Sequence, residues 1–102
     1  MELQNIIETM TEYIMDISEN FYRQHNKEAY SKLDELYMQF DLLLNNEMVM
    51  KNDILKSNVI DISRFLNNIM EALKEQDGVL IADILRFDIG NSILNMIDEI
   101  GE

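Results

Sequence analysis

The chain has one histidine, His25, and no cysteine, which restricts the chemistry that its side chains could perform. A phosphotransfer histidine would lie in the middle of an exposed helix face, whereas His25 lies between Arg23 and Asn26 in a segment typical of a turn. A di-metal carboxylate site in a helical bundle needs Glu-x-x-His pairs, and no Glu stands three positions before His25. Without a second histidine or a thiol no nucleophile–base pair can form, and no glycine-rich phosphate loop is present. We therefore expect a non-enzymatic protein with no metal and no cofactor.

Asp83 is the charged residue most at odds with its surroundings, because it lies between Ala82 and Ile84 in the most apolar stretch of the chain, residues 77–89. An unpaired buried carboxylate would be energetically costly. Arg86, three residues later, could form an ion pair with Asp83 on a narrow exposed stripe of a helix. The two residues could instead form a polar anchor inside an interface, and the sequence leaves both interpretations open.

Two apolar segments could contact a partner. Residues 77–89 are apolar over about three quarters of the helical wheel, more than one bundle core usually covers, so a second copy of the chain or another protein could cover the surplus. The segment Met48-Val49-Met50, together with Met38, either closes the open end of the core or forms an adaptable contact patch. The residues predicted for a partner or homodimer contact are Leu80, Asp83, Ile84, Arg86, Phe87, Met48, Val49 and Met50.

Apolar residues recur at helical spacing along almost the whole chain, and no segment alternates as a strand would. Helices are expected at about residues 2–23, 27–45 and 52–75, with a fourth from the Asp77-Gly78 turn to about Ile100. Four helices of similar length with short loops predict an all-α fold, a four-helix up-down-up-down antiparallel bundle, with residues 1–102 as one domain.

Three local features qualify this pattern. Residues 77–89 are expected to be covered on nearly every side by the other helices, and Asp77 is a candidate N-cap. A glycine inside a helix costs about 1 kcal/mol relative to alanine, so a kink or short break is expected near Gly90-Asn91-Ser92. The asparagine-rich segment 45–53 predicts a turn and a possible N-cap between the second and third helices, which we expect to be separate.

The net charge of −12 disfavours nucleic acid and anionic membrane surfaces as partners, and permits a basic protein surface or a cation. The same surplus of acid could simply keep a small domain soluble. Residues 1–26 hold five acids and one base, and residues 77–102 hold six acids and one base, so the bundle should have one far more negative side. No signal peptide pattern and no membrane-spanning run is recognised, and a cytoplasmic location is expected.

The segment from Glu71 to Ile89, EALKEQDGVLIADILRFDI, resembles a pattern found in uncharacterised helical domains of Firmicutes bacteria. In that pattern an Ala-Leu pair leads through an Asp to a stretch similar to VLLADLLEYEL. Gly78 stands where the pattern favours an aromatic residue, and Arg86 where it favours an acid. Such domains occur alone or attached to larger proteins, sometimes in motility-related contexts. The resemblance implies a helical domain without an assigned activity, and it transfers no functional residue.

Three functions are compatible with these features. The chain could be an adaptor or a small assembly or export chaperone, for example a flagellar one, that acts through its fourth helix and the acidic side shared with the first. It could be a purely structural homodimer or accessory domain with no separate ligand. It could also be an acidic mimic or antitoxin-like blocker of a basic surface, whose binding should weaken steeply with salt.

Overall fold

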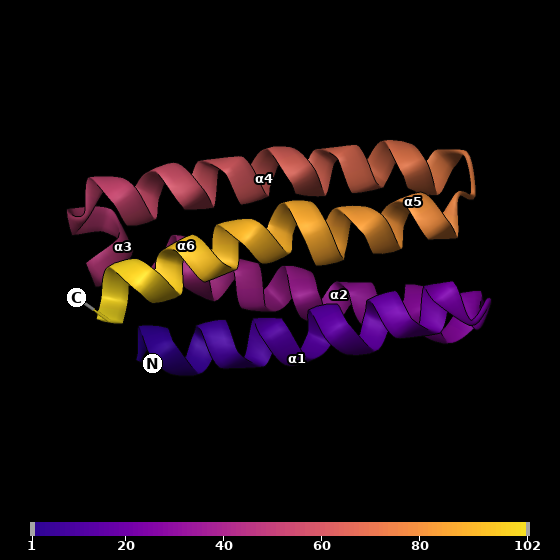
Figure 1. Ribbon diagram of the computed structural model, residues 1–102, viewed down its shortest axis with the longest axis horizontal. Helices are drawn as coiled ribbons and strands as arrows, with labels where there is room; N and C mark the ends of the chain where they lie inside the picture. The colour runs from indigo at the N-terminus through magenta and orange to yellow at the C-terminus, as the bar shows by residue number, and fades with distance from the viewer. Residues whose placement is uncertain (1, 102) are drawn as a thin grey trace.

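The computed structural model describes residues 2–101, and every element in that range is helical (Figure 1). The elements are α1 (Leu3–Tyr22), α2 (Asn26–Leu44), the short α3 (Glu47–Lys51), α4 (Asp53–Lys74), α5 (Gly78–Asp83), the π-helix η1 (Ile84–Ile89) and α6 (Gly90–Gly101). Since α5, η1 and α6 follow one another without a break, they form a fourth long helix, called α5–α6 below. The prediction of an all-α fold is confirmed.

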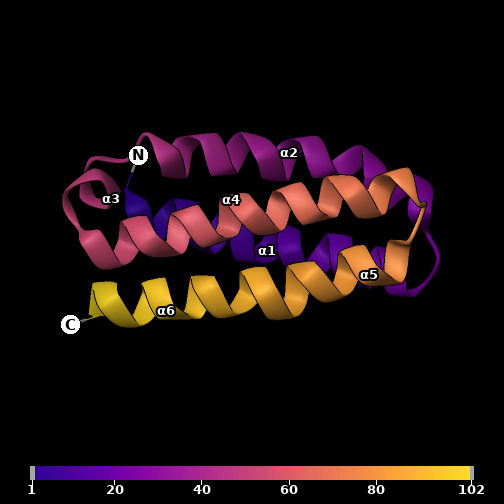
Figure 2. The ribbon, with the colours of Figure 1, turned by 90° about the horizontal axis from the view of Figure 1, so that it is seen from above.

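The four long helices lie side by side along the longest axis of a body that measures 38 × 21 × 20 Å (Figures 1 and 2). In both views α1 and α4 run in one direction along this axis, and α2 and α5–α6 run in the other. Helix α1 packs against α2 and against every part of α5–α6, which in turn packs against α4. The first and last long helices are therefore neighbours, and the two described ends of the chain lie at the same end of the body (Figure 1).

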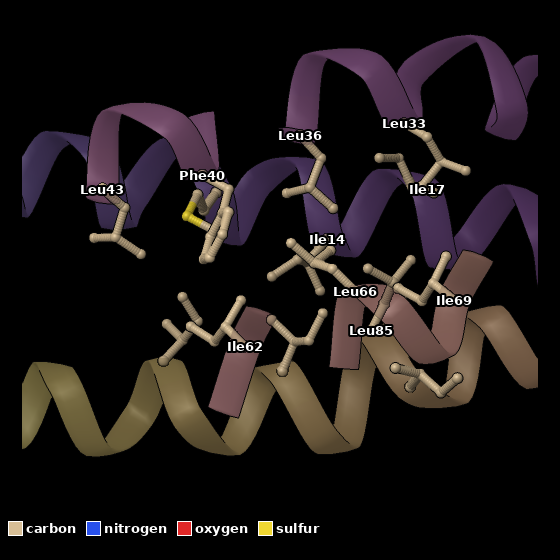
Figure 3. Packing of buried hydrophobic residues seen from close by; sticks show 14 of the residues in the cluster. Ile14, Ile17, Leu33, Leu36, Phe40, Leu43, Ile62, Leu66, Ile69 and Leu85 are labelled. Carbon is tan, nitrogen blue, oxygen red and sulfur yellow. The ribbon is translucent and has the colours of Figure 1, made fainter. Parts of the chain in front are cut away.

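One apolar stripe from each long helix builds the core (Figure 3). The apolar stripe of α1 is buried from Leu3 to Phe21, with Tyr13 partly buried, and that of α4 is buried from Leu55 to Ile69. Full burial of a leucine or isoleucine side chain contributes about 1.5–3 kcal/mol. These stripes, rather than interactions among the surface acids, hold the helices together.

The fourth long helix lies at one side of the bundle, so the expectation that residues 77–89 are covered on nearly every side is wrong. A helix that packs between two neighbours buries only one stripe, and the rest of its circumference faces solvent. Leu80 and Phe87 are 42% and 61% exposed. The residues of this stretch that are buried are Ile81, Ala82, Ile84, Leu85 and Ile89.

Side-chain caps begin three of the helices. Asn46, Asn52 and Asp77 each accept a hydrogen bond from a backbone N–H in the first turn of the helix that follows, at 3.0, 2.9 and 3.0 Å. The N-cap predicted for Asp77 is confirmed, as is the separation of the second and third predicted helices. Helix α3 between them was not expected, because five residues are too few to show a helical period.

Helices α1 and α4 end without glycine. Gln24 and Gln76 adopt left-handed backbone conformations, with φ of 65° and 57°. In each case the N–H of the next residue donates to the carbonyl five residues before it, which satisfies a free carbonyl at the helix end. A left-handed conformation costs a residue with a side chain about 1–2 kcal/mol, so both glutamines are strained relative to glycine.

The fourth helix is not broken at Gly90. This residue has ordinary helical backbone angles, φ −55° and ψ −43°, and the irregularity predicted for residues 90–92 lies one turn earlier, in the π-helix η1. π-helical turns are rare and are frequently found at functional sites. This one directly follows Asp83 and contains Arg86. Both residues face α1, so a functional site is expected where α1 meets the fourth helix.

Candidate functional site

Five polar side chains form a cluster where α1 meets the start of the fourth helix, and we call this cluster the polar latch. The Tyr22 hydroxyl donates to Asp83 Oδ1 at 2.5 Å. Arg86 donates from Nε to Ser18 Oγ at 2.8 Å and from Nη2 to Glu19 Oε2 at 3.2 Å. The Arg86 guanidinium also lies 5.2 Å from the centre of the Tyr22 ring, within the range of a cation–π interaction.

The polar latch replaces the ion pair that the sequence suggested between Asp83 and Arg86. Within residues 2–101 the two side chains make no salt bridge with each other, and both bond to α1 instead. The wider turn of the π-helix increases the angular separation of residues three positions apart, and α1 supplies closer partners. The hydrogen bond to Asp83 raises the pKa of Tyr22, burial raises it further, and the positive charge of Arg86 opposes the rise.

Charge is distributed unevenly among the helices. Helices α1 and α5–α6 together carry eight acids and one base, Arg86. Helix α2 carries four acids and two bases, and α3 and α4 together carry four of each. Four of these acids, Glu8, Glu12, Glu19 and Asp83, lie where α1 meets α5–α6 (Figure 1). Asp16 instead pairs with Lys32 of α2, and Asp98 and Glu99 lie beside α4.

An apolar groove of about 590 Å³ lies on the face that α1 and α5–α6 share, between α1 and α6 at the end that holds the termini. We call it the α1/α6 groove. Ile97, which lines the groove from α6, is 44% exposed. Among residues 2–101 no lysine or arginine forms an ion pair with Glu8 or Glu12. The groove is lined by Gln4, Ile7, Glu8, Thr11, Glu12, Ile97, Ile100 and Gly101.

A second hollow, of about 650 Å³, opens at the same end of the body. It shares Gln4 and Ile100 with the α1/α6 groove and continues to Leu42 at the end of α2 and to Met48 on α3. Met48 is 54% exposed there. The apolar surface at this end therefore extends beyond the groove itself.

The residues predicted for a partner contact do not form one continuous surface. Val49 and Ile84 are 2% and 6% exposed and belong to the core, so their assignment to a contact surface is wrong. Val49 lies on the inner side of α3 and helps to close the end of the core, the other role considered for this segment. Four of the predicted residues are exposed: Leu80 and Phe87 on the fourth helix, and Met48 and Met50 on α3.

The remaining predicted contact residues, Asp83 and Arg86, are half-buried in the polar latch.

The α1/α6 groove was not predicted, since its apolar residues looked like ordinary members of helix stripes. One available signal could have located it. Neither α1 nor α6 contains a lysine or an arginine. Because the first and fourth helices were expected to be neighbours, this absence marks the place where they meet.

Comparison with known proteins gives a family and no function. A family model described as a domain of unknown function (DUF8042) matches residues 1–99. No match to the chain was found among the curated proteins or among the solved structures. The resemblance of residues 71–89 implied an uncharacterised domain family, and the family that matches is likewise one of unknown function, with no bacterial group assigned. No helix within residues 2–101 is both long and apolar enough to cross a membrane.

Proposed function

Because the chain belongs to the DUF8042 family, whose description assigns no activity, we propose its function from the face shared by α1 and α5–α6. The protein is a non-enzymatic interaction module that binds another protein through this face, as an adaptor or a small assembly or export chaperone does. Its scaffold is an up-down-up-down antiparallel four-helix bundle. The first and last long helices of such a bundle are neighbours and can present one common binding surface.

The α1/α6 groove is the observation that carries this proposal. It combines an apolar floor with two carboxylates, Glu8 and Glu12, that have no ion-pair partner within the described residues. Removal of apolar surface from water contributes about 25 cal/mol per Å², so a partner that covers Ile97 gains free energy. The two carboxylates are one helical turn apart and repel each other by about 0.2–0.5 kcal/mol, which a bound cation would relieve.

The polar latch gives this face a fixed shape. It joins α1 to the fourth helix through Tyr22–Asp83 and through the contacts of Arg86 with Ser18 and Glu19. Side chains held by hydrogen bonds and packing keep a binding surface close to its binding-competent geometry, which lowers the entropic cost of association.

A structural homodimer is the second candidate. It is favoured by the many large apolar side chains that are more than 40% exposed in the described chain, among them Met38 on α2 and Ile60 and Met70 on α4. Two copies would meet through other faces than that of α1 and α5–α6, because the four acids that lie there on each copy, against the single base Arg86, would repel one another. A hollow lined by Leu44, Met50 and Ile60 lies on such a face.

Affinity capture from cells of the source organism tests the proposal. The bait would be the wild-type chain, the Glu8→Lys/Glu12→Lys variant, and a Glu35→Lys/Asp41→Lys control that changes the charge equally on exposed positions of α2. We expect the wild type and the control to recover the same protein and the groove variant to lose it. Equal recovery by all three baits, or nothing above background after crosslinking, would contradict the proposal. Recovery of the chain itself by all three would favour the homodimer.

A further inference from the structure

Resting on the proposed function, we infer that the α1/α6 groove binds a basic amphipathic helix. Apolar side chains of that helix enter the groove against Ile7, Ile97 and Ile100, and its lysines or arginines pair with Glu8 and Glu12. This assigns the partner a chemical class, a positively charged helical segment.

The length of the groove along α1 matches two turns of a helix. Its lining on α1 recurs at positions 4, 7, 8, 11 and 12, which is one face of α1 over two turns, or about 12 Å. Ile97 and Ile100 supply the opposite wall from α6, which runs in the reverse direction beside α1 (Figure 1). An amphipathic helix that lies in an apolar groove uses anchors at i, i+3 or i+4, and i+7, a spacing that also covers two turns.

Charge selects which amphipathic helix can bind. Glu8 and Glu12 are one turn apart on the rim, so bases one turn apart on the partner would face them. Arg86 is the one base on the described residues of α1 and α5–α6, and it is held at the other end of the face by Ser18 and Glu19. A partner helix therefore meets no positive charge at the groove. An acidic helix, or a second copy of this face, would be repelled.

Fluorescence anisotropy with a synthetic peptide tests this inference. The probe is a labelled helix of about 18 residues, or five turns, with leucine at i, i+3, i+4 and i+7 spacing and lysine elsewhere. Two groove variants, Glu8→Gln/Glu12→Gln and Ile97→Ser, are compared with two controls, Glu35→Gln/Asp41→Asn and Leu94→Ser. Leu94 is a matched control because it is 59% exposed on the same helix as Ile97 and does not line the groove.

We expect the Glu8→Gln/Glu12→Gln variant to raise the Kd about two- to thirtyfold, the effect of two rim ion pairs. Ile97→Ser should also weaken binding, and both controls should bind as the wild type does. Binding should fall as salt rises from about 50 mM to about 300 mM, since exposed charges are screened. A peptide with glutamate in place of lysine should not bind.

Three results would overturn the inference: no binding of the lysine peptide, equal losses in groove and control variants, or binding of the glutamate peptide. The proposed function is judged separately by affinity capture. If the lysine peptide fails to bind while the Glu8→Lys/Glu12→Lys bait still loses its partner, the face binds a protein of another class. If both experiments fail, the face is not a binding surface.

Discussion

Replacement of Tyr22 by phenylalanine should destabilise the protein measurably, because one hydroxyl joins α1 to the fourth helix. Tyr22 donates to Asp83 at 2.5 Å, across 61 positions of the chain. The Tyr22→Phe variant keeps the ring, and with it the contact to the Arg86 guanidinium. Only the hydrogen bond is lost, and the half-buried Asp83 carboxylate is left without that donor.

The expected loss of stability follows from the charge on the acceptor of the Tyr22–Asp83 hydrogen bond and from the exposure of the two side chains. A hydrogen bond to a charged group contributes about 1.5–3 kcal/mol to the free energy of unfolding. Asp83 and Tyr22 are only partly buried, so water can replace part of the lost interaction, and we expect a loss of about 1–1.5 kcal/mol. With a urea m-value of about 1.5 kcal/mol/M for a domain of this size, the unfolding midpoint should fall by about 0.7–1 M.

Urea unfolding followed by circular dichroism measures this shift, and Tyr37→Phe is the matched control. The Tyr37 hydroxyl is buried and has no hydrogen-bond partner within the described residues. Its removal should leave stability unchanged or raise it, because an unsatisfied buried polar group is removed.

A double-mutant cycle with Asp83→Ala separates the bond from other effects of Tyr22→Phe. We expect a coupling of about 1 kcal/mol between the two substitutions, since residues in direct contact are not additive. A coupling near zero, or an equal loss for Tyr22→Phe and Tyr37→Phe, would refute the reasoning on the polar latch.

Four further predictions concern stability and can be measured by the same unfolding assay. Gly78→Ala should cost about 1–3 kcal/mol by overpacking, because a Cβ there would lie 2.9 Å from Phe21 Cδ1. Gly90→Ala should instead add about 0.5–1 kcal/mol, because its nearest neighbour would be at 3.6 Å; equal effects at both glycines would contradict this explanation. Gln76→Gly should add about 0.5–1 kcal/mol by relieving the left-handed backbone, and a loss would show that no strain is present. The raised pKa of Tyr22 means that its contribution is complete below about pH 10 and is lost as pH rises through the folded-state pKa; Tyr22→Phe should make stability fall less steeply above pH 10.

The sequence was sufficient to predict where the helices lie along the chain. It was not sufficient to predict which sides of each helix are buried. Apolar periodicity located the four long helices to within one or two residues, because each buries one regular stripe. The same periodicity could not show that Leu80 and Phe87 face solvent, since a helix with apolar residues on several sides has no unique inner face. Which side is covered depends on the neighbouring helices, and these are set by the whole bundle.

The candidate site was predicted only in part, because its residues come from two distant segments. Asp83 and Arg86 were recognised as unusual, but their partners lie more than 60 positions away on α1. The π-helix that follows Asp83 and contains Arg86 has no residue signature, and the glycine after it suggested a kink instead. The left-handed glutamines at two helix ends were equally invisible, since glycine is the usual signal at that position.

Photo-crosslinking in cells tests the central claim, that the face of α1 and α5–α6 binds another protein. A photoreactive amino acid would be placed at Thr11, on the rim of the α1/α6 groove, and for comparison at Ser57, an exposed position on α4. We predict that one defined protein crosslinks from Thr11 and not from Ser57. The same crosslinks from both positions, or none from Thr11, would contradict the claim.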